Sequence, residues 1–218
     1  MSPATFKQNR TQNVLRDGIP FVLIPLAAAL LAALTGYWYV AVPLLLLALF
    51  MAYFFRDPER ASLSDEDVIV APADGRVTRV AQVIPDDPAS PQVVSIFLSV
   101  FDVHVNRAPI AGEITDVAYT KGRFMIATRE EASVVNEQNA LTIKGERMTV
   151  VCKQIAGVLA RRIVCWKRKG ERVGLGERFG LIKFSSRTDL VLPAEVDVSV
   201  RVGDRVRGGV SIIGRLRR

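Results

Sequence analysis

The chain has 218 residues, a formal net charge of +7, one histidine and two cysteines, a length that suits one globular domain plus an accessory segment. Cys152 and Cys165 lie in apolar stretches without CxxC spacing, so we interpret them as core residues of a protein in a reducing compartment. Paired metal ligands would need more Cys or His than the chain contains, and we expect no metal site. The mild basicity fits an anionic membrane surface or a phosphate-bearing substrate better than duplex DNA, so we expect no nucleic-acid partner.

The first predicted element is a long apolar segment. No charged residue lies between Asp17 and Arg56, a stretch that is too long for one bilayer span and slightly short for two full ones. Near its middle Thr35-Gly36 offers a turn, and three aromatic residues follow, of the kind that prefer the lipid–water boundary. We therefore predict two helices, about 19–34 and 38–54.

Flanking charges predict how this helical hairpin, which we place at residues 19–55, is oriented. Basic residues lie beyond both of its outer ends. The positive-inside rule then puts the segment 1–18 and the domain 56–218 on the cytoplasmic face of the cell (inner) membrane. A shallow hairpin inserted in one leaflet would satisfy the same charges, and a core hairpin of a soluble protein is a further alternative.

The domain over 56–218 has about 160 residues, enough to bury its own core. Short β-branched runs separated by Gly, Pro and Asp predict a mostly-β barrel or sandwich, with a helical stretch near 130–138. The runs are Val68–Val70, Val77–Val80, Val93–Leu98, Leu141–Ile143, Met148–Val151, Leu181–Phe184 and Val196–Val202. Residues 200–209, with Gly203-Asp204 as a predicted hairpin turn, resemble the turn of biotinyl/lipoyl-type barrel-sandwich modules.

The candidate chemistry rests on one histidine and one pair of hydroxyls. An apolar run ends in Ser185-Ser186, and His104 follows another apolar run, so it is the obvious base at neutral pH. Asp74 could orient the imidazole as the third member of a Ser-His-Asp arrangement. The Asp74-Gly75 dipeptide alone favours an ordinary turn. The G-x-S-x-G turn of a conventional hydrolase does not occur in the chain.

Four separated motifs together resemble one family. They are Phe55–Arg60, Ala71–Gly75, Phe101–Arg107 and Gly176–Arg187. In this order they are similar to motifs of the short bacterial and archaeal phosphatidylserine decarboxylases, a family that makes a pyruvoyl cofactor from one of its own serines. The resemblance spans nearly all of residues 55–218, and an N-terminal hydrophobic hairpin is also a feature of this group.

The resemblance implies a role for each candidate residue. Ser186 matches the serine that becomes the pyruvoyl group, and His104 matches the active-site histidine. Asp74 matches the aspartate that supports self-cleavage, here by orienting the histidine. Arg107 stands where longer relatives have a second histidine, so we expect His104 to serve both proenzyme cleavage and decarboxylation.

The same resemblance implies the reaction. A cut between Ser185 and Ser186 gives a β chain, 1–185, and an α chain, 186–218, which remain together as a heterodimer. The pyruvoyl group from Ser186 then forms a Schiff base with phosphatidylserine, CO2 leaves, and phosphatidylethanolamine is released in phospholipid biosynthesis. Ser185 holds the position of the family's glycine, a change expected to slow cleavage, to block it or to offer a competing hydroxyl.

Two functions of other classes stay open on the sequence. One is a membrane-tethered, non-catalytic barrel-sandwich module that binds a partner, and the other is an ordinary Ser-His-Asp lipid hydrolase. For the decarboxylase, the expected partners are phosphatidylserine, membrane lipid and the chain's own two fragments, and a homodimer is also open.

Overall fold

A computed structural model of the chain describes residues 3–60, 65–127, 129, 131–158, 162–184 and 186–217. The chain divides into two compact units, Met1–Pro58 and Glu59–Arg218. The first unit is helical and the second is built mainly of strands. The change in structure therefore follows the change in composition, from an uncharged apolar stretch to short β-branched runs.

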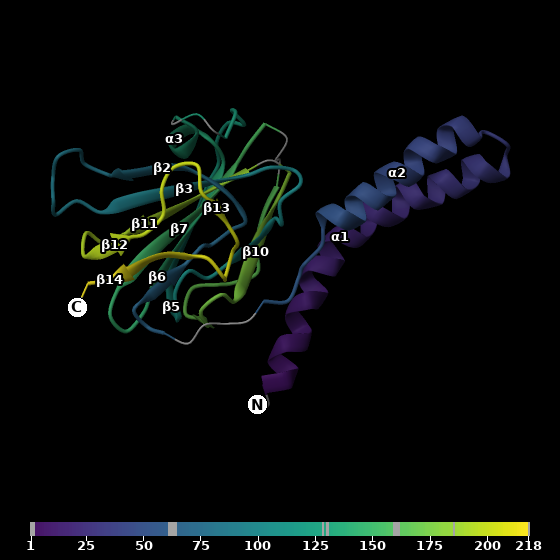
Figure 1. Cartoon of the computed structure of the whole chain (residues 1–218). Helices are drawn as coiled ribbons and strands as arrows, with labels where there is room; N and C mark the ends of the chain where they lie inside the picture. The colour runs from purple at the N-terminus through teal and green to yellow at the C-terminus, as the bar shows by residue number, and fades with distance from the viewer. Residues whose placement is uncertain are drawn as a thin grey trace. The chain divides into compact units, whose positions relative to one another are not determined.

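The first unit is a pair of helices, α1 (Pro3–Leu34) and α2 (Trp38–Phe54), which run antiparallel beside each other (Figure 1). In the turn between them Gly36 has a left-handed φ of +81°, a conformation that glycine adopts without steric cost. The break and the second helix lie where the sequence predicts them. The first helix differs, because it begins at Pro3 instead of near residue 19.

Both helices expose apolar side chains over much of their surface. Ile24, Leu34 and Trp38 are 70%, 77% and 71% exposed, and a continuous apolar surface of this kind is suited to hydrocarbon rather than to water. Within α1, the segment Arg16–Leu34 is long and apolar enough to cross a bilayer by length and composition, whereas α2 has only 17 residues. These features support membrane association of the first unit.

The second unit is mostly β, as predicted, with one short helix, α3 (Ala132–Val135), inside the predicted helical stretch. Its strands are β1 (Val68–Val70), β2 (Gly75–Gln82), β3 (Gln92–Leu98), β4 (Val105–Arg107), β5 (Gly112–Thr120), β6 (Gln138–Lys144), β7 (Thr149–Ala156), β8 (Arg162–Cys165), β9 (Arg172–Val173), β10 (Arg178–Lys183), β11 (Ser186–Leu192), β12 (Val196–Val198), β13 (Arg205–Val206) and β14 (Ile212–Leu216).

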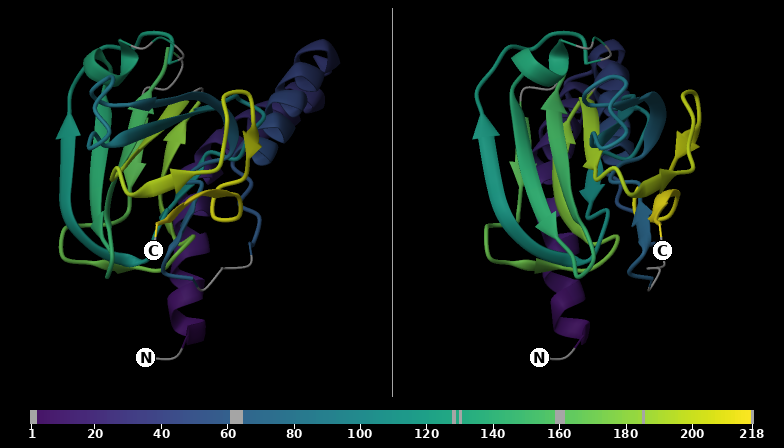
Figure 2. Two further views of the ribbon diagram at one scale, coloured as in Figure 1. Left: turned by 60° about the vertical axis from the view of Figure 1, so that its left-hand side comes forward. Right: turned by 90° about the vertical axis from the view of Figure 1, so that its left-hand side faces the viewer.

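These strands form three antiparallel sheets. The largest has eight strands in the order β13-β2-β3-β11-β7-β6-β5-β9 and curls around the domain (Figure 2). The other two have three strands each, β4-β10-β8 and β1-β14-β12. Fully buried Ile69 from β1, Ile96 from β3 and Phe179 from β10 belong to one core, so all three sheets pack around the same apolar interior.

One end of the eight-stranded sheet gathers the segments that matter for function. The ends of five neighbouring strands are aligned there by the pairs Thr120↔Gln138, Gln138↔Ile155, Ser186↔Ala156 and Ser186↔Leu98. We name it the Ser186 end. The described residues that leave the sheet there are 99–104, 121–127, 131–137, 157–158 and 184. Figure 2 shows α3 above the strands at this end.

The opposite end of the same sheet is formed by the tight connection between β6 and β7, and we name it the hairpin end. There the Gly145 N–H donates to the Met148 carbonyl at 2.9 Å. Along β7, seven residues lead from Thr149 to Ala156, the neighbour of Ser186, a distance of roughly 23 Å at the usual rise of a strand. The two ends are therefore distinct places.

The turn predicted at Gly203-Asp204 is present. Gly203 has a φ of +101°, and the Asp204 N–H donates to the Arg201 carbonyl at 3.1 Å. Because the chain enters this turn, β12 ends at Val198, earlier than the β-branched run that predicts it. The mostly-β class expected from the sequence is confirmed, with a curled eight-stranded sheet and two smaller ones.

Candidate functional site

Hydrogen bonds bring the four sequence motifs together. Arg60 in the first motif binds the carboxylate of Asp74 in the second at 2.6 Å. The backbone of the second motif accepts a hydrogen bond from the Arg107 N–H of the third at 2.9 Å. The His104 carbonyl of the third motif accepts one from the Ile182 N–H of the fourth at 3.3 Å. Segments up to 122 residues apart thus form one connected region.

Asp74 is held by the residues around it in a way that the sequence does not predict. Its two carboxylate oxygens accept hydrogen bonds from Arg60 at 2.6 and 2.7 Å, and one of them also accepts the Gly208 N–H at 2.8 Å. The next residue, Gly75, begins β2, and a Cβ there would lie 2.1 Å from the Phe97 carbonyl oxygen. Asp74 is therefore neither part of an ordinary turn nor hydrogen-bonded to the His104 ring.

His104 lies immediately before β4 and is 3% exposed. Its Nδ1 lies 3.0 Å from the carbonyl oxygen of Asp102. Because a carbonyl oxygen only accepts, this contact favours the tautomer in which Nδ1 carries the hydrogen. In the neutral ring Nε2 is then the basic nitrogen, which is the state that a general base requires.

Ser186 is the first residue of β11 and is completely buried. It pairs with Leu98 on one side and Ala156 on the other. Its Oγ has no hydrogen-bond partner among the described residues of the chain. A buried polar group left without a partner costs about 1–3 kcal/mol, so a hydroxyl at this position is explained better by chemistry than by stability.

The chain just before Ser186 is strained. Phe184 has a φ of +66°, in the left-handed region that bulky side chains rarely adopt. Such a conformation costs about 1–3 kcal/mol and persists where the surrounding structure enforces it. The predicted cleavage position Ser185 lies outside the described residues. The strained residue and the buried hydroxyl are its two immediate neighbours in the chain.

A buried chain of polar side chains, which we name the amide network, links β4 to β11. The Asn106 Nδ2 donates to the Thr188 Oγ1 at 3.1 Å, and the Gln154 Nε2 donates to the Asn106 Oδ1 at 2.9 Å. The Asn139 Nδ2 completes it by donating to the Gln154 Oε1 at 3.1 Å. All four side chains are at most 3% exposed. The sequence analysis missed this network, although Asn106 lies in a quoted motif.

The amide network lies close in sequence to the two candidate catalytic residues. His104 is two residues before Asn106, and Ser186 is two residues before Thr188. Side chains two residues apart in an extended strand point to the same side. Ser186 therefore projects to the same side of β11 as Thr188, whereas His104 lies just outside β4. The structure shows no hydrogen bond to Ser186 Oγ from the described residues.

Positive side chains are buried close to these residues. Lys183 is 6% exposed, and Arg187, directly after Ser186, is 2% exposed. Arg187 is fixed by two hydrogen bonds to Asp189, at 2.6 and 2.8 Å. Arg107 donates to the Gly176 carbonyl at 3.2 Å. The positive charge of Arg187 is thus balanced by Asp189 inside the sheet.

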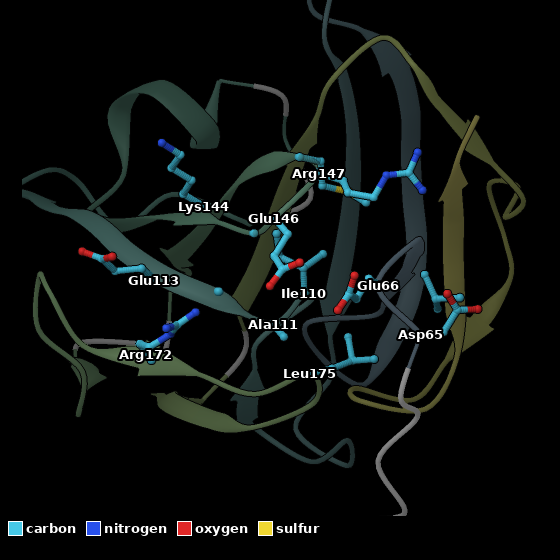
Figure 3. A pocket seen from close by; sticks show the side chains of 14 residues that line it. Asp65, Glu66, Ile110, Ala111, Glu113, Lys144, Glu146, Arg147, Arg172 and Leu175 are labelled. Carbon is cyan, nitrogen blue, oxygen red and sulfur yellow. The ribbon is translucent and has the colours of Figure 1, made fainter. Parts of the chain in front are cut away.

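A cavity of about 560 Å³ lies at the hairpin end, away from Ser186 (Figure 3). Charged side chains of both signs line it, among them Glu66, Glu146, Lys144 and Arg172. Most of the length of β7 separates this cavity from Ser186. Among the residues that the structure describes, no cluster of His, Cys, Asp or Glu suits a metal ion, in the cavity or elsewhere.

Comparison with known proteins assigns the chain to a class of proenzymes. A family model described as phosphatidylserine decarboxylase matches residues 47–214, which include all the residues of the site. A relative in Solibacter usitatus, named phosphatidylserine decarboxylase proenzyme, is 51% identical over 202 residues, covering 93% of this chain and 96% of its own.

Two further relatives carry the same name. The protein from Symbiobacterium thermophilum is 47% identical over 210 residues, covering 93% of this chain and 95% of its own. The protein from Magnetococcus marinus is 43% identical over 210 residues, covering 94% and 95% of the two chains. The chain therefore belongs to the phosphatidylserine decarboxylase family, as its four motifs predicted.

Proposed function

We propose that this chain is a proenzyme that cuts its own backbone between Ser185 and Ser186 and then decarboxylates phosphatidylserine to phosphatidylethanolamine. Membership of the family supports the reaction and the substrate. The observation that carries the self-cleavage is the buried Ser186 Oγ without a partner among the described residues, two residues after the strained Phe184.

In the cleavage step Ser186 Oγ attacks the carbonyl carbon of Ser185, and the peptide C–N bond between the two serines breaks to leave an ester. His104 accepts the hydroxyl proton through Nε2, and the released amine takes up a proton. Loss of the α-hydrogen of Ser186 then expels the carboxylate of Ser185. Water hydrolyses the resulting unsaturated residue, which releases ammonia and leaves a ketone at the new N-terminus.

The residues of the site fit a pyruvoyl group formed from Ser186, because a buried hydroxyl without a described partner stands where the group would be made. Once formed, the group supplies the carbonyl that takes up the substrate's amine and accepts the electrons released with CO2. Buried Lys183 offers positive charge to the substrate's phosphate and carboxylate, whereas the charge of Arg187 is balanced by Asp189. His104 returns a proton to the substrate carbon when CO2 has left.

The α fragment, 186–218, would stay bound to the β fragment, 1–185, after the cut. Its first strand, β11, lies inside the eight-stranded sheet, with β3 on one side and β7 on the other. Both neighbours belong to the larger fragment, so their main-chain hydrogen bonds to β11 do not depend on the cut bond. This position supports a permanent heterodimer of the two fragments.

We assign Asp74 a supporting role in self-cleavage. Its carboxylate accepts hydrogen bonds from both Arg60 and Gly208. For Asp74 to orient His104 directly, this loop would have to take a different arrangement.

We further propose that the second unit is a biotinyl/lipoyl-like barrel-sandwich and that it acts on the cytoplasmic face of the inner membrane, anchored by the apolar helices. A homodimer remains open.

Denaturing gels with intact-mass analysis test the proposed cleavage. Purified chain should yield a fragment of 33 residues, 186–218, with a blocked N-terminus, while Ser186→Ala stays intact. A single uncleaved chain that does not release CO2 from phosphatidylserine would exclude the proposal for this sequence. A lipid hydrolase would remain intact with either residue, and a binding module would neither cut nor turn over lipid.

A further inference from the structure

Large exposed apolar side chains of the second unit gather around the Ser186 end. Phe101 follows β3, Phe124 and Ile126 follow β5, Val134 lies on α3 and Val158 follows β7. They are between 38% and 76% exposed. Since the strand ends that carry these segments are aligned by pairing, the four segments leave the sheet at the same end.

The exposed charge at this end is mainly positive. Lys121, Arg123, Arg129 and Arg162 are exposed at this end. The described acidic residues facing the same way are the exposed Glu131 and the partly buried Asp102 and Glu137. Apolar side chains mixed with Lys and Arg are the composition of surfaces that lie in the headgroup region of an anionic bilayer.

The position of the rim agrees with the substrate of the proposed function, on which this argument rests. A phospholipid must bring its headgroup to the buried Ser186 while its acyl chains stay in an apolar environment. An apolar rim around Ser186 provides that environment only if it faces the bilayer. Arg60, which is fixed to Asp74 just before β2, also lies at this end.

We propose that the Ser186 end is itself a bilayer-docking surface, in addition to the apolar helices of the first unit. Phe101, Phe124, Ile126, Val134 and Val158 enter the headgroup region of an anionic membrane, and the surrounding Lys and Arg side chains contact lipid phosphates. The docked domain receives phosphatidylserine directly from the bilayer, without lifting the whole lipid into water.

Tryptophan fluorescence in the full-length chain tests this docking. In a background with Trp38→Phe and Trp166→Phe, single tryptophans are placed by Phe101→Trp and Val134→Trp. Ile84→Trp is the matched control, because Ile84 is also exposed but lies after Gln82 at the far end of β2. The proteins are reconstituted in phosphatidylcholine–phosphatidylserine vesicles whose acyl chains are brominated near the headgroup.

We expect quenching at positions 101 and 134 to exceed that of the control by about twofold or more. Equal quenching at all three positions, or none at 101 and 134, would overturn the docking. Quenching needs neither cleavage nor turnover, so this result is independent of whether the proposed function holds.

A second measurement uses lipid presentation. The exposed pair Ile126→Asp with Val134→Asp should raise the KM of processed enzyme for phosphatidylserine in vesicles several-fold, with kcat unchanged. The KM for dispersed short-chain phosphatidylserine should stay the same, and Ile84→Asp should change neither value. An equal rise of KM for both forms of the lipid would count against docking and indicate a damaged site.

Discussion

The two ends of the eight-stranded sheet are made by the same strands and have opposite properties. At the Ser186 end, polar side chains are buried, one hydroxyl has no described partner and Phe184 is strained. At the hairpin end, charged side chains line an open cavity, and the ion pair between Arg147 and Asp67 is partly exposed. Stability alone would favour the second arrangement. The difference indicates that the Ser186 end is organised for chemistry at a cost in folding free energy.

The largest effect is expected from removing the base. His104→Ala should slow both self-cleavage and decarboxylation by about 10²–10⁴-fold, the usual contribution of a positioned proton-transfer group. The measurements are the time course of fragment release on denaturing gels and CO2 release from phosphatidylserine. Glu146→Ala at the hairpin end is the matched control and should leave both rates unchanged. Similar losses in the two variants would remove the functional distinction between the ends.

The second largest effect is expected at the cleavage position itself, where the resemblance to the family implies a glycine in place of Ser185. Glycine lowers the cost of strained backbone by about 1 kcal/mol or more, so Ser185→Gly should cleave several-fold faster than the chain with Ser185. The rate of appearance of the 33-residue fragment measures this effect. If Ser185→Gly cleaves no faster, backbone freedom at this position does not limit the reaction.

The amide network should dominate stability at the Ser186 end. Gln154→Ala leaves the amide oxygen of Asn106 and the amide nitrogen of Asn139 without this partner, which should lower the free energy of unfolding by about 2 kcal/mol or more. Denaturant unfolding of the Ser186→Ala chain, which stays uncut, gives the reference. Arg147→Ala at the hairpin end should cost only about 1 kcal/mol or less, because its ion pair is partly exposed.

The smallest effect is expected midway between the ends, at Cys152 on β7. Burial raises the pKa of its thiol, and nearby Asp189 raises it further. A raised pKa keeps the thiol protonated at neutral and mildly alkaline pH, and the thiolate is the reactive form. Thiol reagents at pH 8 should therefore leave Cys152 unmodified in the folded chain. Peptide mapping after alkylation measures this, and rapid modification of native protein would contradict the burial of β7.

The sequence predicts those parts of the fold that local chemistry determines. Val68–Val70 and Val93–Leu98 are uniform β-branched or apolar runs, and both form strands with nearly the predicted bounds. The helix break at Thr35-Gly36 was predictable because glycine tolerates the φ that the turn needs. By contrast, the first half of β11 is polar in sequence, so its burial could not be predicted. Arg187 and Asp189 neutralise each other only in the folded sheet.

The sequence predicts which residues belong to the site but not how these residues are arranged in space. His104, Ser186 and Asp74 stand out by their motifs, but the partner of Asp74 proves to be Arg60 and Gly208, which only tertiary folding brings to it. Gln154 lies in a strand with no motif around it, and it reaches Asn106 across 48 positions of sequence. No local sequence pattern indicates such a contact, so the amide network could be identified only from the structure.

The interior position of β11 also bears on how the protein can be made. Before the cut, this strand pairs with β3 and β7 as part of one covalent chain, so its folding is unimolecular. After the cut, the same pairing would require two separate molecules to meet, and the equilibrium would depend on protein concentration. The uncut chain could then refold by itself, whereas the two fragments of an unfolded mature enzyme would have to associate again. Thermal unfolding should accordingly be permanent after processing and reversible before it.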